Sequence, residues 1–125
     1  INSAPQDVAY YTVECSADCS HIYASALPIG FYYSYDYGKT WTNASAVSLP
    51  PEQLYLITTS GTGELVHVAG PNIGPYSSSD YGETFTISQS FSQQGRDWGS
   101  IACSFDGGIV VVTAMSSING KWNGD

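Results

Sequence analysis

The sequence predicts an all-β fold built from repeated four-stranded antiparallel units, and three observations support this prediction. Only 11% of the 125 residues are charged, whereas the chain contains ten tyrosines and thirteen glycines, a composition typical of strands and turns. No segment shows sustained helical periodicity with capping residues. Two sets of landmarks also recur every 44 residues, as expected of an internal repeat.

The first landmark is a nine-residue formula, Ser-x-Asp-Tyr-Gly-x-Thr-aromatic-Thr, which occurs as SYDYGKTWT at 34–42 and as SSDYGETFT at 78–86. The second is a turn that begins at Ser16, Ser60 and Ser104, and its register also aligns Cys19 with Gly63 and Gly107. Two landmarks with one period divide the single domain 1–125 into repeats at about 8–51, 52–95 and 96–125, the last of them truncated.

Each repeat is expected to contain four short strands. In the first repeat these are a β-rich run at about 8–16, HIYASA at 21–26, GFYYS at 30–34 and TWTNAS at 40–45, separated by turns or Gly and Pro breaks. The equivalent runs are LYLITTS and LVHVA in the second repeat and WGSIACS and IVVVTA in the third. Four strands in about 44 residues indicate the blade of a β-propeller.

The third repeat should bring a further copy of the formula around Trp122. With one inserted residue, Asn123 and Asp125 would match its Ser and Asp, and the rest would lie beyond the last residue. The chain starts at Ile1 without a signal-like segment, so we expect that it is processed, excised or part of a longer protein.

Every fixed residue of the formula has a structural role. Asp36 is expected to accept hydrogen bonds from backbone N–H groups one to three residues ahead, which closes an Asx-type turn. Gly38 suits a positive φ, Thr40 restarts a strand, and Trp41 can bury its ring between sheets. The full set of predicted structural residues is Ser34, Asp36, Gly38, Thr40, Trp41, Ser78, Asp80, Gly82, Thr84 and Phe85.

The formula resembles the Asp-box, or BNR repeat, with the pattern S-x-D-x-G-x-T-W. SYDYGKTW matches every fixed position, and SSDYGETF differs only at Phe85. The chain is therefore similar to Asp-box β-propellers, such as sialidase-like and sortilin-like propellers, over about 2.8 repeats. The resemblance implies that these hairpins join the third and fourth strands at the periphery, away from any active site, so it indicates the fold and leaves the function open.

The charge distribution excludes some classes of partner. Eleven acidic residues and three basic ones give a formal net charge of -8, which disfavours nucleic acid. No apolar run is long enough to predict a membrane span. His21 and His67 lie in different phases of the repeat without ligand-like spacing, so we expect strand-face residues and neither a metal site nor a cofactor.

The enzyme classes are disfavoured to different degrees. Sialidases resemble one another in using three arginines to hold a carboxylate, and this chain has only Arg96. A glycosidase with two carboxylates stays open, because acidic residues lie outside the repeat-defining turns: Glu14, Glu52, Glu64, Glu83 and Asp97. Asp97 stands beside Trp98, as in a sugar site; alternatively, Trp98 begins an innermost strand and Asp97 is a solvated turn residue.

Aromatic residues offer candidate ligand contacts. Tyr33, Tyr35 and Tyr37 alternate along one strand and turn, so some of these rings, together with Trp98, could stack on a glycan or anchor a protein. The alternative is packing between neighbouring blades, where both faces of each sheet are covered.

Two features favour an extracellular or luminal location. Cys15 and Cys19 are close enough in sequence for a disulfide across a tight turn, although three reduced thiols, with Cys103, are the alternative. The tripeptide NAS makes Asn43 a candidate N-glycosylation site.

A propeller closes with about four to eight blades, so about 2.8 blades cannot close. The partners we expect are further blades in the same chain or other copies of it, with a glycan or protein as a ligand. The sequence therefore predicts a non-catalytic extracellular β-propeller module for binding or self-assembly. The alternative is a fragment of a secreted glycoside hydrolase of the Asp-box propeller type.

Overall fold

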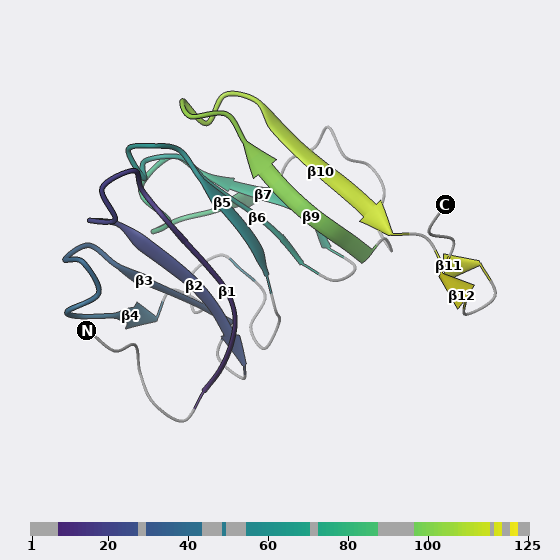
Figure 1. Ribbon diagram of the computed structural model, residues 1–125, viewed down its shortest axis with the longest axis horizontal. Coiled ribbons are helices and arrows are strands. Elements are labelled where there is room, and N and C mark those ends of the chain that lie inside the picture. Colours follow the sequence, from purple (N-terminus) through teal and green to yellow (C-terminus); the bar gives the residue numbers. More distant parts are fainter. Residues whose placement is uncertain are drawn as a thin grey trace.

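The protein is all-β in the part of the chain that its computed structural model describes, namely residues 8–27, 30–43, 49, 55–70, 73–87, 97–115, 117–118 and 121–122. These residues form antiparallel sheets and no helix (Figure 1). Among them, no helix is long and apolar enough to cross a membrane.

Two complete four-stranded sheets are present, each with its strands in chain order. The first, unit 1, contains β1 (Ala9–Cys15), β2 (Ile22–Leu27), β3 (Gly30–Ser34) and β4 (Thr42–Asn43). The second, unit 2, contains β5 (Leu56–Thr59), β6 (Val66–Gly70), β7 (Ile73–Ser78) and β8 (Thr86–Ile87). The four-stranded antiparallel repeat predicted from the sequence is confirmed in both units.

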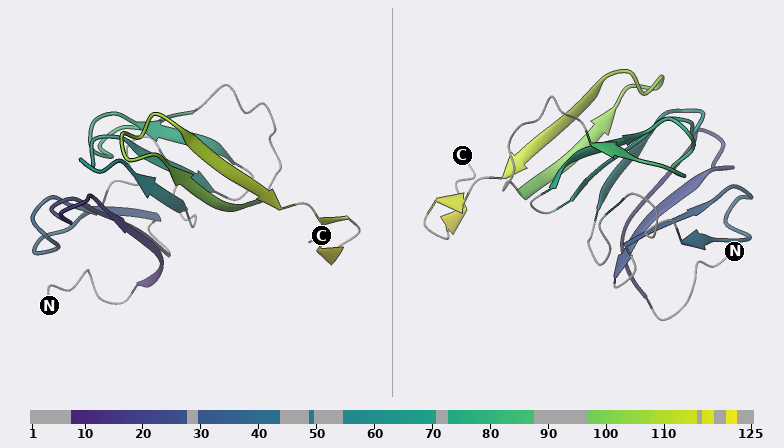
Figure 2. Two further views of the ribbon diagram at one scale, coloured as in Figure 1. Left: turned by 45° about the horizontal axis from the view of Figure 1, so that its top comes forward. Right: turned by 180° about the vertical axis from the view of Figure 1, so that it is seen from behind.

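The described residues of the third repeat do not form one four-stranded sheet. Unit 3 consists of β9 (Asp97–Cys103) and β10 (Val110–Met115), while β11 (Ser117–Ile118) and β12 (Lys121–Trp122) form a separate hairpin that lies apart from the three units in both views of Figure 2. Asp97 is the exposed first residue of β9, so the expectation that it lies in a turn is wrong. The match expected at Asn123 and Asp125 lies outside the described residues.

The three units stack side by side, and their first strands are neighbours: β1 lies beside β5, and β5 beside β9 (Figure 1). Each sheet therefore has a back face, turned toward the next unit, and a front face, turned toward the preceding one. Strand alternation decides which side chains lie on each face. In unit 1 the back face carries Tyr23 and Phe31, and the front face carries Ala24 and Tyr32.

The hydrophobic core lies between units 1 and 2. The ring of Phe31 packs edge-on against Phe85, with centroids 5.3 Å apart, and stacks against Tyr23 at 6.1 Å. Phe85 therefore buries its ring between sheets as expected, whereas Trp41 remains half-exposed. The buried members of this core are Tyr23, Phe31, Leu49, Tyr55, Ile57, Val66, Val68 and Phe85.

Candidate functional site

The two nine-residue hairpins, 34–42 and 78–86, share one hydrogen-bond pattern. In the first, the Ser34 hydroxyl donates to Asp36 Oδ1 (2.8 Å) and accepts the Gly38 N–H (2.9 Å). Asp36 in turn accepts the Thr40 N–H (2.8 Å) and the Thr40 hydroxyl (2.6 Å). The carboxylate thus reaches Thr40, four residues ahead, and a backbone hydrogen bond from Lys39, three residues ahead, also lowers its pKa. The turn contains two consecutive positive φ values, 60° at Tyr37 and 80° at Gly38.

The second hairpin repeats these bonds. Ser78 donates to Asp80 (2.6 Å), Gly82 donates to Ser78 (2.9 Å), and Asp80 accepts both the N–H and the hydroxyl of Thr84. Gly82 has φ 84°. The side chains of Ser78, Asp80 and Thr84 therefore close the turn, which supports a structural role.

Hydrogen bonds also fix the charge of these carboxylates. The hydroxyl and backbone N–H of Thr40 lower the pKa of Asp36 to about 2. At Asp80, burial raises the pKa, but hydrogen bonds from Ser78 and Thr84 outweigh it and the pKa is lowered. A group with such a pKa stays ionised at neutral pH, so neither carboxyl suits the role of a general acid.

A second set of hairpins links the units. These hairpins join the first two strands of each unit, and each is bonded to the next: the Ala17 N–H donates to the Gly61 carbonyl (2.8 Å), and the Gly61 N–H donates to the Phe105 carbonyl (2.7 Å). Successive contacts are 44 residues apart, so the junctions between units 1 and 2 and between units 2 and 3 have the same register.

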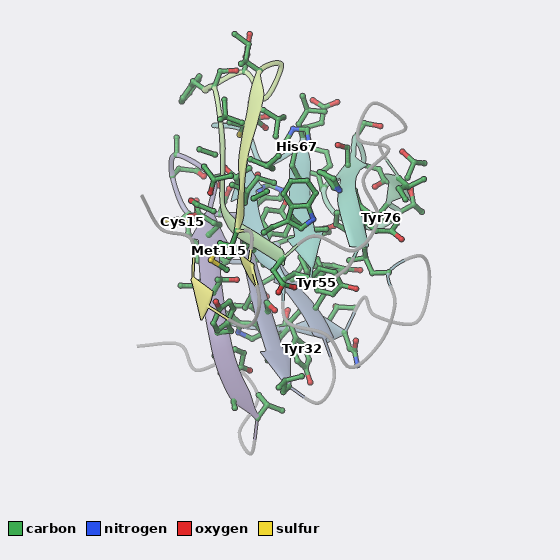
Figure 3. The ribbon with its side chains drawn as sticks, turned by 90° about the vertical axis from the view of Figure 1, so that its right-hand side faces the viewer. Cys15, Tyr32, Tyr55, His67, Tyr76 and Met115 are labelled. Atoms are coloured by element: carbon green, nitrogen blue, oxygen red, sulfur yellow. A yellow bond between two sulfur atoms is a disulfide. The ribbon has the colours of Figure 1, made fainter. Side chains whose placement is uncertain are left out.

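Side chains repeat the same junction. The Tyr23 hydroxyl donates to the Gly63 carbonyl (2.6 Å). His67 (labelled in Figure 3) occupies the position of Tyr23 in unit 2. It donates from Nε2 to the Gly107 carbonyl (3.0 Å), and its Nδ1 lies 2.8 Å from the Ser77 hydroxyl. Burial lowers the pKa of His67 more than the bond to Gly107 raises it. His67 is thus a buried strand residue, while His21 lies in the bend before β2.

The predicted ligand-contact tyrosines have different environments. Tyr33 and Tyr35 stack with centroids 4.6 Å apart, and the Tyr35 hydroxyl donates to the Tyr81 carbonyl of unit 2 (2.7 Å). His21 stacks on Tyr81 at 4.9 Å and contacts Tyr35 at 5.1 Å. This geometry favours packing between units for Tyr33 and Tyr35, whereas Tyr37 is 56% exposed.

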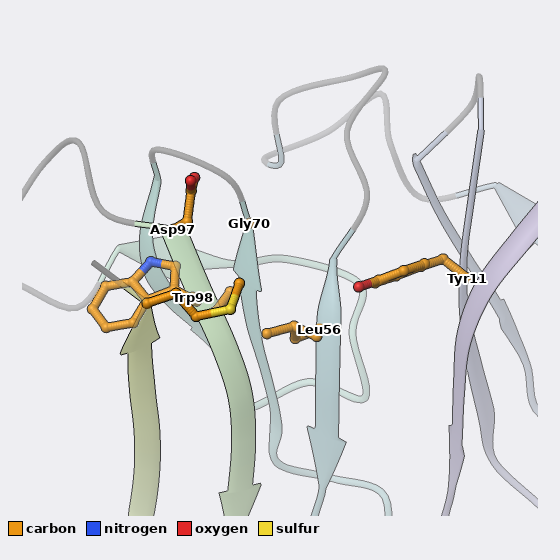
Figure 4. A pocket seen from close by; sticks show the side chains of 7 residues that line it. Tyr11, Leu56, Gly70, Asp97 and Trp98 are labelled. Atoms are coloured by element: carbon orange, nitrogen blue, oxygen red, sulfur yellow. The ribbon is translucent and has the colours of Figure 1, made fainter. Parts of the chain in front are cut away.

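A pocket of about 210 Å³ lies where all three units meet, at the start of β9. Asp97 and Trp98 border it from unit 3, and the ring of Tyr11 extends toward Leu56 from the other side (Figure 4). Its remaining lining residues are Ala69, Gly70 and Met115. The sequence pointed to Asp97 and Trp98 but missed Tyr11, because no local pattern places β1 across from β9.

This pocket has an apolar floor and one carboxylate among its lining residues, that of Asp97. An aromatic plane beside a carboxylate can stack a sugar ring and accept its hydroxyls. The second carboxylate that glycoside hydrolysis requires does not come from the other described candidates, since Glu14 is on β1, Glu64 follows the turn at 60–63, and Glu83 lies in the second nine-residue hairpin. Glu52 and Arg96 lie outside the described residues.

The front face of unit 1 forms a second hollow, of about 370 Å³. Val13 is 66% exposed there, whereas Ile57, its counterpart in unit 2, is buried against unit 1. The lining residues are Tyr10, Tyr11, Thr12, Val13, Ile22, Ala24 and Trp41.

The other candidate sites can be placed directly. Cys15 and Cys19 form a disulfide across the turn between β1 and β2, with Cα atoms 4.9 Å apart, and Cys103 is a half-buried free thiol. Asn43 is an exposed residue of β4. Within the described residues, no cluster of three or more His, Cys, Asp or Glu side chains could hold a metal ion.

Comparison with known proteins supports the fold. A scan against protein-family models gives no match, and a search of curated proteins gives none. Among solved structures the chain is similar to the β-propeller protein YCF48 from Cyanidioschyzon merolae, with a TM-score of 0.54 and 15% identity. The match covers 94% of this chain and 41% of that one. The chain therefore has the fold of part of a β-propeller and spans less than half the length of this neighbour.

Proposed function

We propose that the chain is a non-catalytic module of the β-propeller type, extracellular or luminal, whose role is binding or assembly. The observation that carries this proposal is the recurrence of one junction, from Ala17 to Gly61 and from Gly61 to Phe105. Sheets that stack by a fixed rule bury their faces only against further sheets. The partners are therefore further blades, in the same chain or in another, with a glycan or a protein as the ligand.

We also assign the two nine-residue hairpins to the Asp-box type. Their support is the full set of bonds among Ser34, Asp36 and Thr40, which unit 2 repeats. An extracellular or luminal location agrees with the Cys15–Cys19 disulfide, which persists in oxidising compartments, and with the exposure of Asn43.

The first test measures the mass of the denatured polypeptide and the native mass of its particle. A particle larger than one chain, or a polypeptide with further repeats, supports the module. A compact and stable monomer of this chain alone would contradict the need for further blades. Treatment with a peptide N-glycosidase, compared with an Asn43→Gln variant, tests the glycan at Asn43.

The second candidate is a piece of a glycoside hydrolase, favoured by the pocket that Tyr11, Asp97 and Trp98 border. Hydrolysis of a panel of aryl glycosides tests it, with Asp97→Asn as the diagnostic variant. Turnover that disappears in Asp97→Asn would favour the hydrolase over the module. Binding of a sugar without turnover, weakened by Trp98→Ala, would favour the module.

A further inference from the structure

One turn position controls how closely two units approach. Cys19, Gly63 and Gly107 occupy the same place in the three units, and all have positive φ, at 55°, 83° and 74°. In units 2 and 3 this glycine faces the preceding unit. A Cβ at Gly63 would lie 2.8 Å from the Cβ of His21, and one at Gly107 would lie 2.8 Å from the Cβ of Leu65.

Neither contact could relax cheaply, because a Cβ is fixed to the backbone and cannot swing away. The observed junctions therefore require glycine at this position. The hydrogen bonds agree, since the carbonyl groups of Gly63 and Gly107 accept the side chains of Tyr23 and His67 from the preceding unit.

Unit 1 breaks this rule. Cys19 has a side chain at the position that requires glycine, and its disulfide to Cys15 holds it in the turn. Suppose that another unit packed in front of unit 1 in the same register. Its residue equivalent to His21 would then clash with the Cβ of Cys19. In a second copy that stacks through unit 3, this residue is Ile109.

The other end of the chain fits a second copy no better. Val111 occupies the position of Tyr23 and His67 in unit 3, and a valine has no donor for the Cys19 carbonyl. The back face of unit 3 is nevertheless open and apolar: Ile109 is 68% exposed and Val111 59%, whereas His67 in unit 2 is only 7% exposed.

We propose that the Cys15–Cys19 hairpin prevents copies of this chain from stacking head to tail, and that the back face of unit 3 binds a further blade that carries glycine at the position of Gly63 and Gly107. This inference rests on the proposed function, because it treats each unit as a blade. We expect a blade on this face because the junctions between units 1 and 2 and between units 2 and 3 continue in the same register. The Cβ of Cys19 excludes the contact between two copies of this chain. A different blade with glycine at this position has no such Cβ and can bind.

The test compares two variants that differ only in that Cβ. Two variants share the changes Cys15→Ser and Val111→His, which open the disulfide and supply the missing donor, and they differ in carrying Cys19→Gly or Cys19→Ala. Sedimentation velocity over a wide concentration range measures self-association of each variant and of the wild type, and circular dichroism checks that each is folded.

We expect the glycine variant to associate at least about tenfold more tightly than the alanine variant, and the wild type to show no association through this contact. Adding Ile109→Asp to the glycine variant should abolish its association, because the aspartate would be buried without a partner against the turn between β1 and β2 of the next copy.

Two results would overturn the proposal. One is equal association of the glycine and alanine variants, including none in either. The other is association of the wild type that Ile109→Asp abolishes. Association of the wild type through Ile109 would still give a particle larger than one chain, which supports the proposed module, and hydrolysis of aryl glycosides is measured separately. Failure of this inference can therefore be told apart from failure of the proposed function.

Discussion

The hydroxyl of Tyr23 offers a direct measurement of the junction between units 1 and 2. Tyr23 is fully buried, and its hydroxyl donates to the carbonyl of Gly63, which is also buried (2.6 Å). Burial raises the pKa of this phenol, so the group stays protonated and keeps donating at any ordinary pH. Tyr23→Phe removes this hydrogen bond and leaves the ring packed against Phe31.

The expected loss comes from the carbonyl left without its donor. A hydrogen bond contributes about 0.5–1.5 kcal/mol net, and a buried polar group left unsatisfied costs about 1–3 kcal/mol. We therefore expect Tyr23→Phe to lower the free energy of unfolding by about 1–3 kcal/mol. For a domain of this size, each kcal/mol corresponds to about 4 °C in the melting temperature.

Urea denaturation measures this change, provided that tryptophan fluorescence and far-ultraviolet circular dichroism give coincident transitions. Tyr11→Phe is the matched control, because Tyr11 is 59% exposed on β1 and an exposed hydroxyl should change stability by less than about 0.5 kcal/mol. Equal and small effects of the two variants would refute the role of Tyr23 as a link between units.

Three further predictions test the turns and the second junction. Gly107→Ala should destabilise the protein by more than about 1 kcal/mol, since it combines a φ of 74° with a Cβ 2.8 Å from that of Leu65; Gly108→Ala, whose Cβ would meet only ordinary contacts, is the control in the same urea assay. The carboxyl of Asp36 should titrate near pH 2 when it is followed by NMR. Because folding lowers its pKa, its contribution to stability is complete above about pH 4 and is lost as the pH falls toward 2. A titration near pH 4 would contradict the turn geometry. Folding lowers the pKa of His67, so its contribution to stability should be complete above about pH 6.5 and decline as the pH falls below that value. His67→Gln should remove this part of the pH dependence of the urea midpoint. An unchanged pH profile in the variant would show that His67 is not the titrating group.

The sequence was informative wherever structure depends on neighbours in the chain. The bonds of the nine-residue hairpin join Ser34, Asp36 and Thr40, which span only seven residues, so their spacing alone predicts the turn. Strand positions followed from β-rich runs between these turns. The bonds of Asp36 extend one residue beyond the expected range, to Thr40, in a turn where Tyr37 adopts a positive φ.

The candidate sites depended on contacts that local patterns do not show. Tyr11 and Asp97 meet at one pocket although they are far apart in sequence, and the functions of Tyr23 and His67 appear only when one unit is placed beside the next. The shared phase of Tyr23 and His67 in the 44-residue repeat was the available signal.

The sequence by itself determined the repeat, its turns and its strands, because each of these is fixed by backbone geometry and hydrogen bonds within a few residues. Only the tertiary structure decided which faces meet and how closely, because these depend on the rotation and distance between sheets. The same distance makes glycine obligatory at Gly63 and Gly107 and makes Cys19 an obstacle.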